Sequence, residues 1–140
     1  VYSSKILNFI NKTGNVFAIQ FPYNFANTKI ITVKKSHILF ARSIFLQGLL
    51  LNKEIKKKIP KKLILAHTKY FNTIKTKKLN PLELCVNYAF NQKRLNYLVV
   101  GCDNIDQLRQ LLNSSTNVES KDYNYYKKLF NIPEAHEINF

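Results

Sequence analysis

The chain has 140 residues, of which 46% are hydrophobic and 13% aromatic, so it can bury the core of one globular domain. Lys and Arg number 22 against 8 Asp and Glu, and the formal net charge of +14 raises the question of an anionic partner. The densest lysine runs fall in predicted surface helices and turns, and Lys, Asn and Ile are abundant together, as A/T-biased codons produce. A solvated basic surface is therefore favoured over a nucleic-acid site. The apolar stretch over residues 37–51 is too short and too interrupted by polar residues to span a membrane, which excludes a transmembrane helix there.

The cysteines argue against a metal site. Cys85 and Cys102 are not spaced as metal ligands, and no third cysteine is present to join the three histidines. We expect Cys85 to be a small core residue on the apolar face of a helix. Two unpaired thiols fit a reducing, cytoplasmic location. Because the chain begins with Val1 and has no Met, we expect it to be a fragment of a longer protein.

The first part of the chain predicts a helix, a strand and a second, short helix. The helix is expected over residues 3–14, where apolar residues recur at three- and four-residue spacing between a serine cap and a glycine. The apolar run at 16–21, which Pro22 stops, predicts a buried strand. The segment after it is predicted as a loop, with a short helix at 30–35.

The apolar run at residues 37–42 suits a strand buried on both faces, as in a parallel sheet covered by helices. It ends at the polar pair Arg42 and Ser43, and the carboxyl ends of strands are where ligands bind in α/β folds. The apolar segment 44–51 is then expected to pack as a loop or a single helical turn. Pro60 can open a long helix. One face of that helix is traced by Leu63, Ala66, Tyr70 and Ile74.

The strongest local signal is a helix start at Asn80-Pro81-Leu82-Glu83. Asn80 is a good N-cap, Pro81 suits the first helical position, and Glu83 can reach back to the N–H of the cap. The residues expected to face inward from this helix are Leu82, Cys85, Val86 and Ala89. After a turn, residues 95–101 predict another buried strand.

Two further helices complete the predicted order. An amphipathic helix is expected from Ile105 to Leu112, then a polar linker at 114–120 and a final helix at 123–132. The alternation of strand and helix predicts a parallel sheet. Three parallel strands would leave two long hydrophobic edges, which natural proteins avoid. We therefore expect a partner segment, on the same parent chain or on another.

Three ordered motifs lie at the ends of the predicted strands. They are Ile19-Gln20-Phe21-Pro22-Tyr23-Asn24, then Ala41-Arg42-Ser43 with Gln47-Gly48-Leu49-Leu50, and finally Val99-Val100-Gly101 with Ile105-Asp106-Gln107-Leu108. With residues 80–86 between them, the set resembles the C-terminal half of an aldo-keto reductase, a family of nicotinamide-dependent oxidoreductases. The resemblance covers about residues 1–113. It implies the fold class α/β, as a partial (β/α)8 TIM barrel with about three parallel strands and surrounding helices, followed at 114–140 by a linker and a C-terminal helical tail.

The resemblance assigns roles at the first two strand ends. Gln20 matches the family's glutamine that hydrogen-bonds the nicotinamide carboxamide, with a buried Gln bonded to backbone as the structural alternative. Arg42 stands where many members place an aromatic residue that stacks on the nicotinamide, and its planar guanidinium can stack or meet the diphosphate. Ser43 matches the serine that helps to hold the diphosphate.

The resemblance also assigns cofactor contacts after the last strand. Gly101 and Asn104 belong to the loop there, and the helix that follows points unpaired N–H groups toward a phosphate. Gln107 matches a position that is Arg or Gln in many members, near the adenosine ribose or its 2′-phosphate. The family's usual Glu-Asn pair further along this helix appears as Gln110-Leu111. This departure leaves the adenine contact and the choice between NADP and NAD open.

The resemblance implies the cofactor-binding half of an oxidoreductase that uses NADP or NAD and acts on a small carbonyl or alcohol substrate, sugar-related compounds among them. The family's catalytic Asp, Tyr, Lys and His come from the first four strands, so we expect none of them in this chain and no turnover by the chain alone. Its partner would be the missing N-terminal half of the barrel. One alternative is a basic, non-catalytic α/β module that binds nucleic acid or an acidic partner. Another is a half-barrel that pairs with a second chain.

Overall fold

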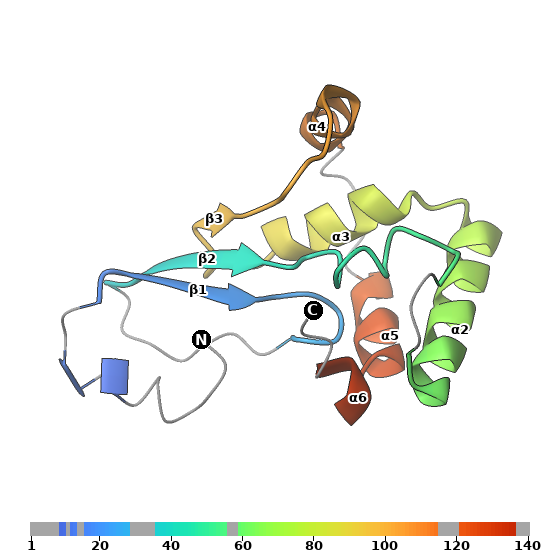
Figure 1. Ribbon diagram of the computed structural model, residues 1–140, viewed down its shortest axis with the longest axis horizontal. Coiled ribbons are helices and arrows are strands. Elements are labelled where there is room, and N and C mark those ends of the chain that lie inside the picture. Colours follow the sequence, from blue (N-terminus) through green and yellow to red (C-terminus); the bar gives the residue numbers. More distant parts are fainter. Residues whose placement is uncertain are drawn as a thin grey trace.

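The computed structural model describes residues 9–10, 12–13, 16–28, 36–55, 59–114 and 121–136. At the centre of the fold is a three-stranded parallel sheet in the order β1-β2-β3, formed by Ala18–Pro22, Ile38–Arg42 and Tyr97–Leu98 (Figure 1). The helices are α2 (Lys61–Lys77), α3 (Pro81–Phe90), α4 (Ile105–Leu112), α5 (Lys121–Leu129) and α6 (Pro133–His136). The predicted α/β class with a parallel sheet is confirmed, whereas closure into a barrel stays a prediction.

Three predicted segments lie wholly or partly outside the described residues. Of the helix expected over 3–14, only residues 9–10 and 12–13 are described, and these are helical. The short helix expected at 30–35 lies outside the described residues, as does the linker at 114–120 apart from its first residue. The described fold therefore begins in practice with β1.

The sheet buries one face and leaves the other partly open. Buried positions on β1 and β2 are paired in register, Ile19 with Leu39 and Phe21 with Ala41. The residues between them face the opposite side and are exposed or half-buried, and Ile38 is 40% exposed. The prediction that the strand at 37–42 is buried on both faces is wrong, because the described residues cover the second face only in part.

The third strand is shorter and more exposed than the one predicted at 95–101. Only Tyr97–Leu98 form β3, and Tyr97 is 57% exposed. Asn96 pairs with β2 just before the strand begins. Its Oδ1 accepts the N–H of Leu39 at 2.8 Å, and its own N–H donates to the Leu39 carbonyl at 3.0 Å. The strand predicted to be buried is thus an edge strand in the described sheet. Its exposure could not be predicted from its apolar sequence.

Helix α2 has the predicted start and the predicted buried face. The Pro60 carbonyl accepts the N–H groups of Leu63 and Ile64 at 2.9 and 3.1 Å, and the helix is followed by the C-cap Lys78, whose φ of 54° is left-handed. The predicted apolar face is buried as a whole, at Leu63, Ala66, Tyr70 and Ile74. Within the described ranges, every helix is too short or too polar to traverse a bilayer.

Helix α3 begins as predicted. The Asn80 Oδ1 accepts the N–H of Leu82 at 2.9 Å and that of Glu83 at 3.5 Å, and Pro81 occupies the first helical position. A carboxamide cap satisfies N–H groups that the first turn of a helix otherwise leaves unpaired. The start of α3 is therefore fixed locally, and this matters because it forms one edge of the pocket described below.

The inward face of α3 is wider than predicted. Cys85, Val86 and Ala89 are buried as expected, whereas Leu82 is only half-buried. Tyr88 is buried as well, because its ring stacks on Tyr23 with 5.0 Å between centroids and meets Tyr123 of α5 at 5.4 Å. Helix α3 is thus packed on more than one side, between the segment after β1 and α5.

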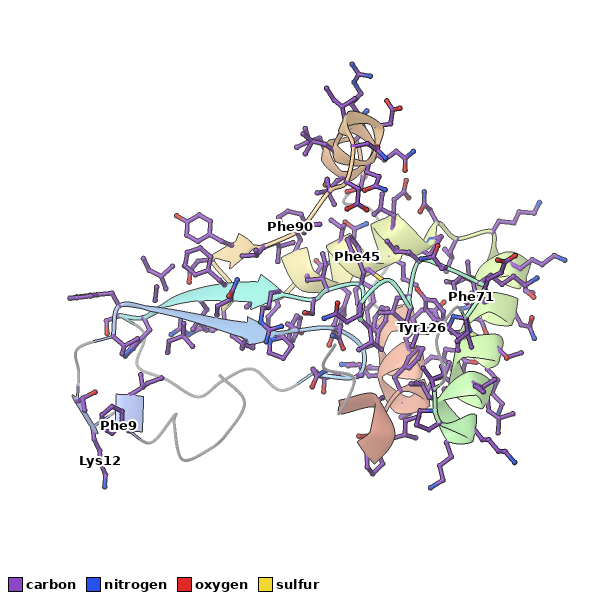
Figure 2. All side chains as sticks on the ribbon, in the orientation of Figure 1. Phe9, Lys12, Phe45, Phe71, Phe90 and Tyr126 are labelled. Carbon is purple, nitrogen blue, oxygen red and sulfur yellow. The ribbon has the colours of Figure 1, made fainter. Side chains whose placement is uncertain are left out.

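Aromatic rings from α2, α5 and the segment after β1 form the middle of the core. The Tyr70 ring centroid lies 5.5 Å from Tyr126 and 5.5 Å from Phe130. Phe25 lies 5.3 Å from Tyr126, and Figure 2 shows Tyr126 in the space between α5 and α2. Side chains beyond residue 113 therefore belong to the same core as α2. The domain division placed there from the sequence stays a prediction.

Candidate functional site

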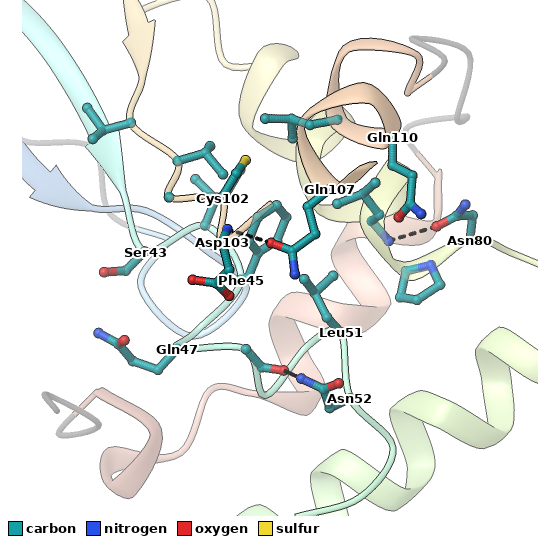
Figure 3. A pocket seen from close by; sticks show the side chains of 18 residues that line it. Ser43, Phe45, Gln47, Leu51, Asn52, Asn80, Cys102, Asp103, Gln107 and Gln110 are labelled. Carbon is teal, nitrogen blue, oxygen red and sulfur yellow. Dashed lines mark hydrogen bonds between the residues drawn. The ribbon is translucent and has the colours of Figure 1, made fainter. Parts of the chain in front are cut away.

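A pocket of about 760 Å³ lies at the carboxyl ends of β2 and β3 (Figure 3). Its lining comes from the turns at residues 43–52, the start of α3, and the segment from Val99 into α4. This volume is typical of sites for small molecules. The carboxyl edge of parallel strands is also where α/β folds bind their ligands. The pocket is therefore the best candidate site in the described part of the chain.

The wall that follows β2 is built from turns with left-handed backbone. Ser43, Leu46 and Gln47 have φ values of 53°, 48° and 56°, and Gly48 has 81°. Residues other than glycine adopt this conformation uncommonly, and it is frequent at ligand sites. Leu46 and Leu50 are buried, while Gln47 is exposed and lines the pocket. Two leucines thus anchor the turns in the core and leave the polar residue between them facing the site.

Helix α2 fixes the far end of these turns. The Nε2 of His67 lies 3.0 Å from the Leu49 carbonyl and 2.9 Å from the Asn52 carbonyl, so this nitrogen carries the proton. The hydroxyl of Tyr70 donates to the Leu50 carbonyl at 3.1 Å. Both donors come from the buried face of α2. The pocket wall is therefore attached to the core by hydrogen bonds as well as by packing.

Asn24 links the segment after β1 to the same wall. It is 1% exposed, and its Nδ2 donates to the Ser43 carbonyl at 2.9 Å. Its Oδ1 accepts the N–H groups of Ala26 and Asn27 at 3.0 and 2.9 Å. The sequence predicts only a loop at Asn24, although the residue ends the first of the three motifs. The structure shows that it holds Ser43 in position.

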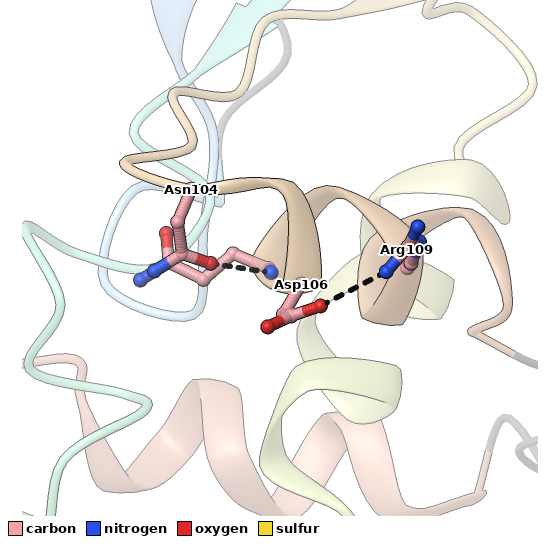
Figure 4. Close-up of polar contacts among 4 residues, drawn as sticks. Asn104, Asp106 and Arg109 are labelled. Carbon is pink, nitrogen blue, oxygen red and sulfur yellow. Dashed lines mark hydrogen bonds and ion pairs between the residues drawn. The ribbon is translucent and has the colours of Figure 1, made fainter.

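The opposite wall is organised by the start of α4. The Asn104 Oδ1 accepts the N–H of Gln107 at 2.9 Å and caps the helix (Figure 4). The Gln107 side chain in turn accepts the N–H of Asp103 at 2.8 Å through its Oε1. These two bonds fix the loop before α4 and the orientation of the Gln107 carboxamide. Gln107 is thus presented to the pocket in a defined rotamer.

The pocket brings together half of the residues predicted to bind a cofactor. Ser43, Gly101 and Gln107 line it, although more than fifty residues separate the first two in the sequence. Arg42 and Asn104 lie beside it. Arg42 donates from Nη1 to the Ser43 Oγ at 3.0 Å, and Asn104 acts as the cap of α4.

Gln20 is placed elsewhere. It is exposed, it is in register with Phe40 of β2, and it is not a lining residue of the pocket. The buried alternative for Gln20 is therefore wrong. Its side of β1 is the partly open face of the sheet, on which Arg42 also lies, two positions further along β2. Gln20 and Arg42 thus share the open face next to the pocket.

The pocket is also lined by four carboxamide side chains that were not predicted from the sequence as site residues. They are Gln47, Asn52, Asn80 and Gln110. Asn80 was expected only to cap a helix, and Gln110 entered only as a departure from a family pattern. Gln47 and Asn52 depend on the left-handed turns for their position, and no local sequence signal predicts those turns. The only sequence signal that could have indicated these two residues is that they follow the end of a predicted strand.

The two cysteines differ sharply in environment. Burial raises the pKa of the Cys85 thiol to about 12, and its Sγ lies 3.8 Å from the hydroxyl of Tyr70. Cys102 is exposed and lines the pocket. The thiolate is the reactive form, so the buried Cys85 should present very little of it near neutral pH. Cys102 is therefore a natural probe of the pocket.

We expect the folded chain to react quickly with one equivalent of a chromogenic disulfide reagent, at Cys102, and with a second only after denaturation. The reason is the burial of Cys85, which removes both access and thiolate. The measurement is thiol release in buffer and then in denaturant. Cys102→Ser serves as the control and should remove the fast phase. Equal rates for both thiols in buffer would contradict the placement of Cys85 in the core.

The site offers groups that bind and orient a polar ligand. Among the described residues, no three His, Cys, Asp or Glu side chains come close enough together to hold a metal ion. The lining supplies a hydroxyl, carboxamides, backbone groups and one carboxylate, that of Asp103. Neither a protein-family model nor a curated protein matches the chain.

Proposed function

We propose that the chain is the cofactor-binding half of a nicotinamide-dependent oxidoreductase of the aldo-keto reductase type, and that the pocket binds the diphosphate and adenosine parts of the dinucleotide. The observation that carries the proposal is the meeting of Ser43, Gly101 and Gln107 in one pocket at the carboxyl ends of parallel strands. Those residues belong to two motifs that resemble cofactor contacts of this family. Ligand binding at this edge of the sheet is the general behaviour of α/β folds.

The proposal implies a direction for the bound dinucleotide. Ser43 is at the end of the pocket nearest the open face of the sheet, where Arg42 and Gln20 lie. A nicotinamide ring would extend onto that face, with its carboxamide toward Gln20. The opposite end of the pocket is formed by Gln107 and Gln110 of α4 and would receive the adenosine. The proposal therefore predicts that a single extended ligand contacts both sets of residues.

The residues at the middle of this path fit a diphosphate. Ser43 lines the pocket, and its Oγ accepts a hydrogen bond from Arg42, which leaves the hydroxyl hydrogen available to an anion. Gln47 and Gly48 line the pocket in left-handed backbone, a conformation that builds anion-binding concavities from N–H groups. The start of α4 adds the positive end of a helix dipole.

The bound cofactor would supply hydride transfer to or from a carbonyl carbon. The residues of this chain would bind it, orient it and keep the diphosphate fixed, while Arg42 and Gln20 would position the nicotinamide. We place the catalytic Asp, Tyr, Lys and His outside this chain, as the resemblance implies. The proposal is therefore that the chain binds the cofactor but does not turn over a carbonyl or alcohol substrate by itself.

Isothermal titration of the 140-residue chain with NAD⁺ and with NADP⁺ tests the proposal, and Gly101→Leu is the decisive variant. Apart from Gly101 and its two chain neighbours, no described atom lies within 4 Å of the position that a Cβ would take there, so a larger side chain fits the folded chain at a residue that lines the pocket. We expect binding of at least one dinucleotide to the unchanged chain and a loss of at least about tenfold in Gly101→Leu. The free energy of unfolding should change by less than about 0.5 kcal/mol.

Asn72→Leu is the matched control, because it adds the same side chain at an exposed position of α2 outside the pocket lining. It should leave the affinity unchanged. Bound dinucleotide should also slow the reaction of Cys102 with a thiol reagent. Failure of both dinucleotides to bind, with a normally folded chain, would reject the proposed function.

A second candidate function is binding of a polyanion, and one observation favours it. Helix α2 carries five lysines and no acidic residue, and all five are exposed, at Lys61, Lys62, Lys69, Lys75 and Lys77. Such binding would weaken steeply with salt and be lost at about 0.5 M. The affinity for the polyanion would be the same in Gly101→Leu. Retention on heparin with that salt dependence, together with no dinucleotide binding, would favour this second function.

A further inference from the structure

We infer that the open face of the sheet binds single-stranded nucleic acid, with its bases stacked on the aromatic pair Phe40 and Tyr97. This inference goes beyond the proposed function and does not depend on it. The two rings are themselves stacked, with 5.0 Å between their centroids and 24° between their planes. Tyr97 is 57% exposed and lies on β3, at the edge of the described sheet (Figure 1). One end of the aromatic pair is therefore open to a further ring.

The aromatic pair belongs to an exposed apolar area. Ile38, two positions before Phe40 on β2, is 40% exposed. Val99, two positions after Tyr97, is 41% exposed, and its N–H continues the pairing with β2 by donating to the Ala41 carbonyl at 2.8 Å. Side chains two positions apart on a strand lie on the same face. Exposed apolar side chains that lie next to one another mark binding surfaces, so this face fits a ligand with planar, apolar groups.

The charges beside this face favour an anionic ligand. Arg42 lies on the face at the carboxyl end of β2. Lys93 and Arg94 lie in the turn that leads into β3, at the amino ends of the parallel strands, and Lys93 is exposed. None of the residues that form β1, β2, β3 or this turn is acidic. In a chain of formal net charge +14, the aromatic pair thus has basic residues toward both ends of the strands and no carboxylate on them.

Single-stranded nucleic acid combines the two properties that this face selects. Its unpaired bases stack on aromatic side chains, and its phosphates are attracted by basic ones. A base can continue the stack of Phe40 and Tyr97 on the exposed side of Tyr97, with phosphates toward Lys93. The bases of a duplex are already stacked on one another, so a duplex offers only its phosphates. The ligand is therefore a single strand.

The nucleic-acid site and the proposed nicotinamide position are neighbours on one face. The register across the sheet places Gln20, Phe40 and Tyr97 side by side in that order. A nicotinamide directed to Gln20 would lie on the β1 side of Phe40, whereas the base would lie beyond Tyr97. Gly101→Leu, which obstructs the pocket, should therefore leave the binding of a single strand unchanged.

Fluorescence anisotropy of a labelled oligothymidylate of about 12 nucleotides, titrated with the 140-residue chain, tests this inference. We expect the single strand to bind at least about tenfold more tightly than a duplex of the same length. Tyr97→Ala should weaken the binding of the single strand by about tenfold, because the stacking of one base is lost. Tyr97→Phe keeps the ring and should keep the affinity. Tyr125→Ala is the matched control, because it removes a ring that is 44% exposed on α5, and it should leave the affinity unchanged.

Heparin, which carries charge but no bases, separates stacking from attraction by the lysines of α2. Tyr97→Ala removes a ring and no charge, so it should leave retention on heparin unchanged. Lys93→Gln should reduce the slope of log affinity for the single strand against log salt by about 0.7, the contribution of one phosphate contact.

Three results would overturn the inference. They are equal affinity for single strand and duplex, full affinity of a folded Tyr97→Ala chain for the single strand, and a salt slope that Lys93→Gln does not change. In each case the polyanion would be held by other basic residues and without stacking at Tyr97. None of these results bears on the titrations with NAD⁺ and NADP⁺, so the proposed function is accepted or rejected separately.

Discussion

Replacement of Tyr70 by Ala is expected to lower the free energy of unfolding by about 4 kcal/mol, a large fraction of the stability of a domain of this size. The Tyr70 ring is fully buried and its centroid lies 5.5 Å from both Tyr126 and Phe130. Removal of the ring leaves a cavity between α2 and α5. It also leaves the Leu50 carbonyl without the hydroxyl that donates to it at 3.1 Å. Urea denaturation followed by circular dichroism gives the measurement.

Two variants separate the contributions to this loss. Tyr70→Phe keeps the ring and removes only the bond to Leu50, so it should cost about 1–2 kcal/mol. Tyr125→Ala removes a ring that is 44% exposed, and it should cost less than about 1 kcal/mol. A similar small loss in Tyr70→Ala and Tyr125→Ala would show that α2 and α5 are not packed together as described.

The elements that the sequence predicted correctly are those with local causes. The start of α3 depends on Asn80 and Pro81, which are adjacent, and the buried face of α2 depends on spacing along one helix. The strand predicted at 95–101 is present in part, but its predicted burial is wrong, because exposure is not a local property. Its apolar residues look the same in sequence whether one side or both sides of the strand are covered, and Tyr97 is 57% exposed.

The candidate site was predictable at the ends of the strands and not between them. Ser43 and Gly101 follow β2 and β3, and parallel pairing brings such ends to one edge of a sheet. Gln47 and Asn52 reach the pocket only through turns in which three residues other than glycine have positive φ values. That conformation is selected by the buried anchors around it, and so it cannot be derived from the residue types alone.

Asn24→Ala is expected to destabilise the chain by about 3 kcal/mol and to weaken dinucleotide binding. The Asn24 side chain is buried and serves three backbone groups, the Ser43 carbonyl and the N–H groups of Ala26 and Asn27. Each buried backbone group that loses its partner costs about 1–3 kcal/mol. The loss of the Ser43 tether should also lower affinity, because Ser43 would no longer be held at the diphosphate. Urea denaturation and titration with NAD⁺ measure the two effects.

Asn24→Asp separates the bond to the Ser43 carbonyl from the two other hydrogen bonds of Asn24. An aspartate keeps an oxygen that accepts the N–H groups of Ala26 and Asn27, but it cannot donate to the Ser43 carbonyl. The affinity for the dinucleotide should therefore fall although these two bonds are kept. Asn27→Ala is the matched carboxamide control, because its Nδ2 makes only a 3.5 Å contact with Asn24, and it should cost less than about 1 kcal/mol. Unchanged affinity in a folded Asn24→Asp chain would mean that Ser43 does not hold the ligand. The diphosphate contact would then have to come from the backbone of the turn at Gln47 and from the start of α4.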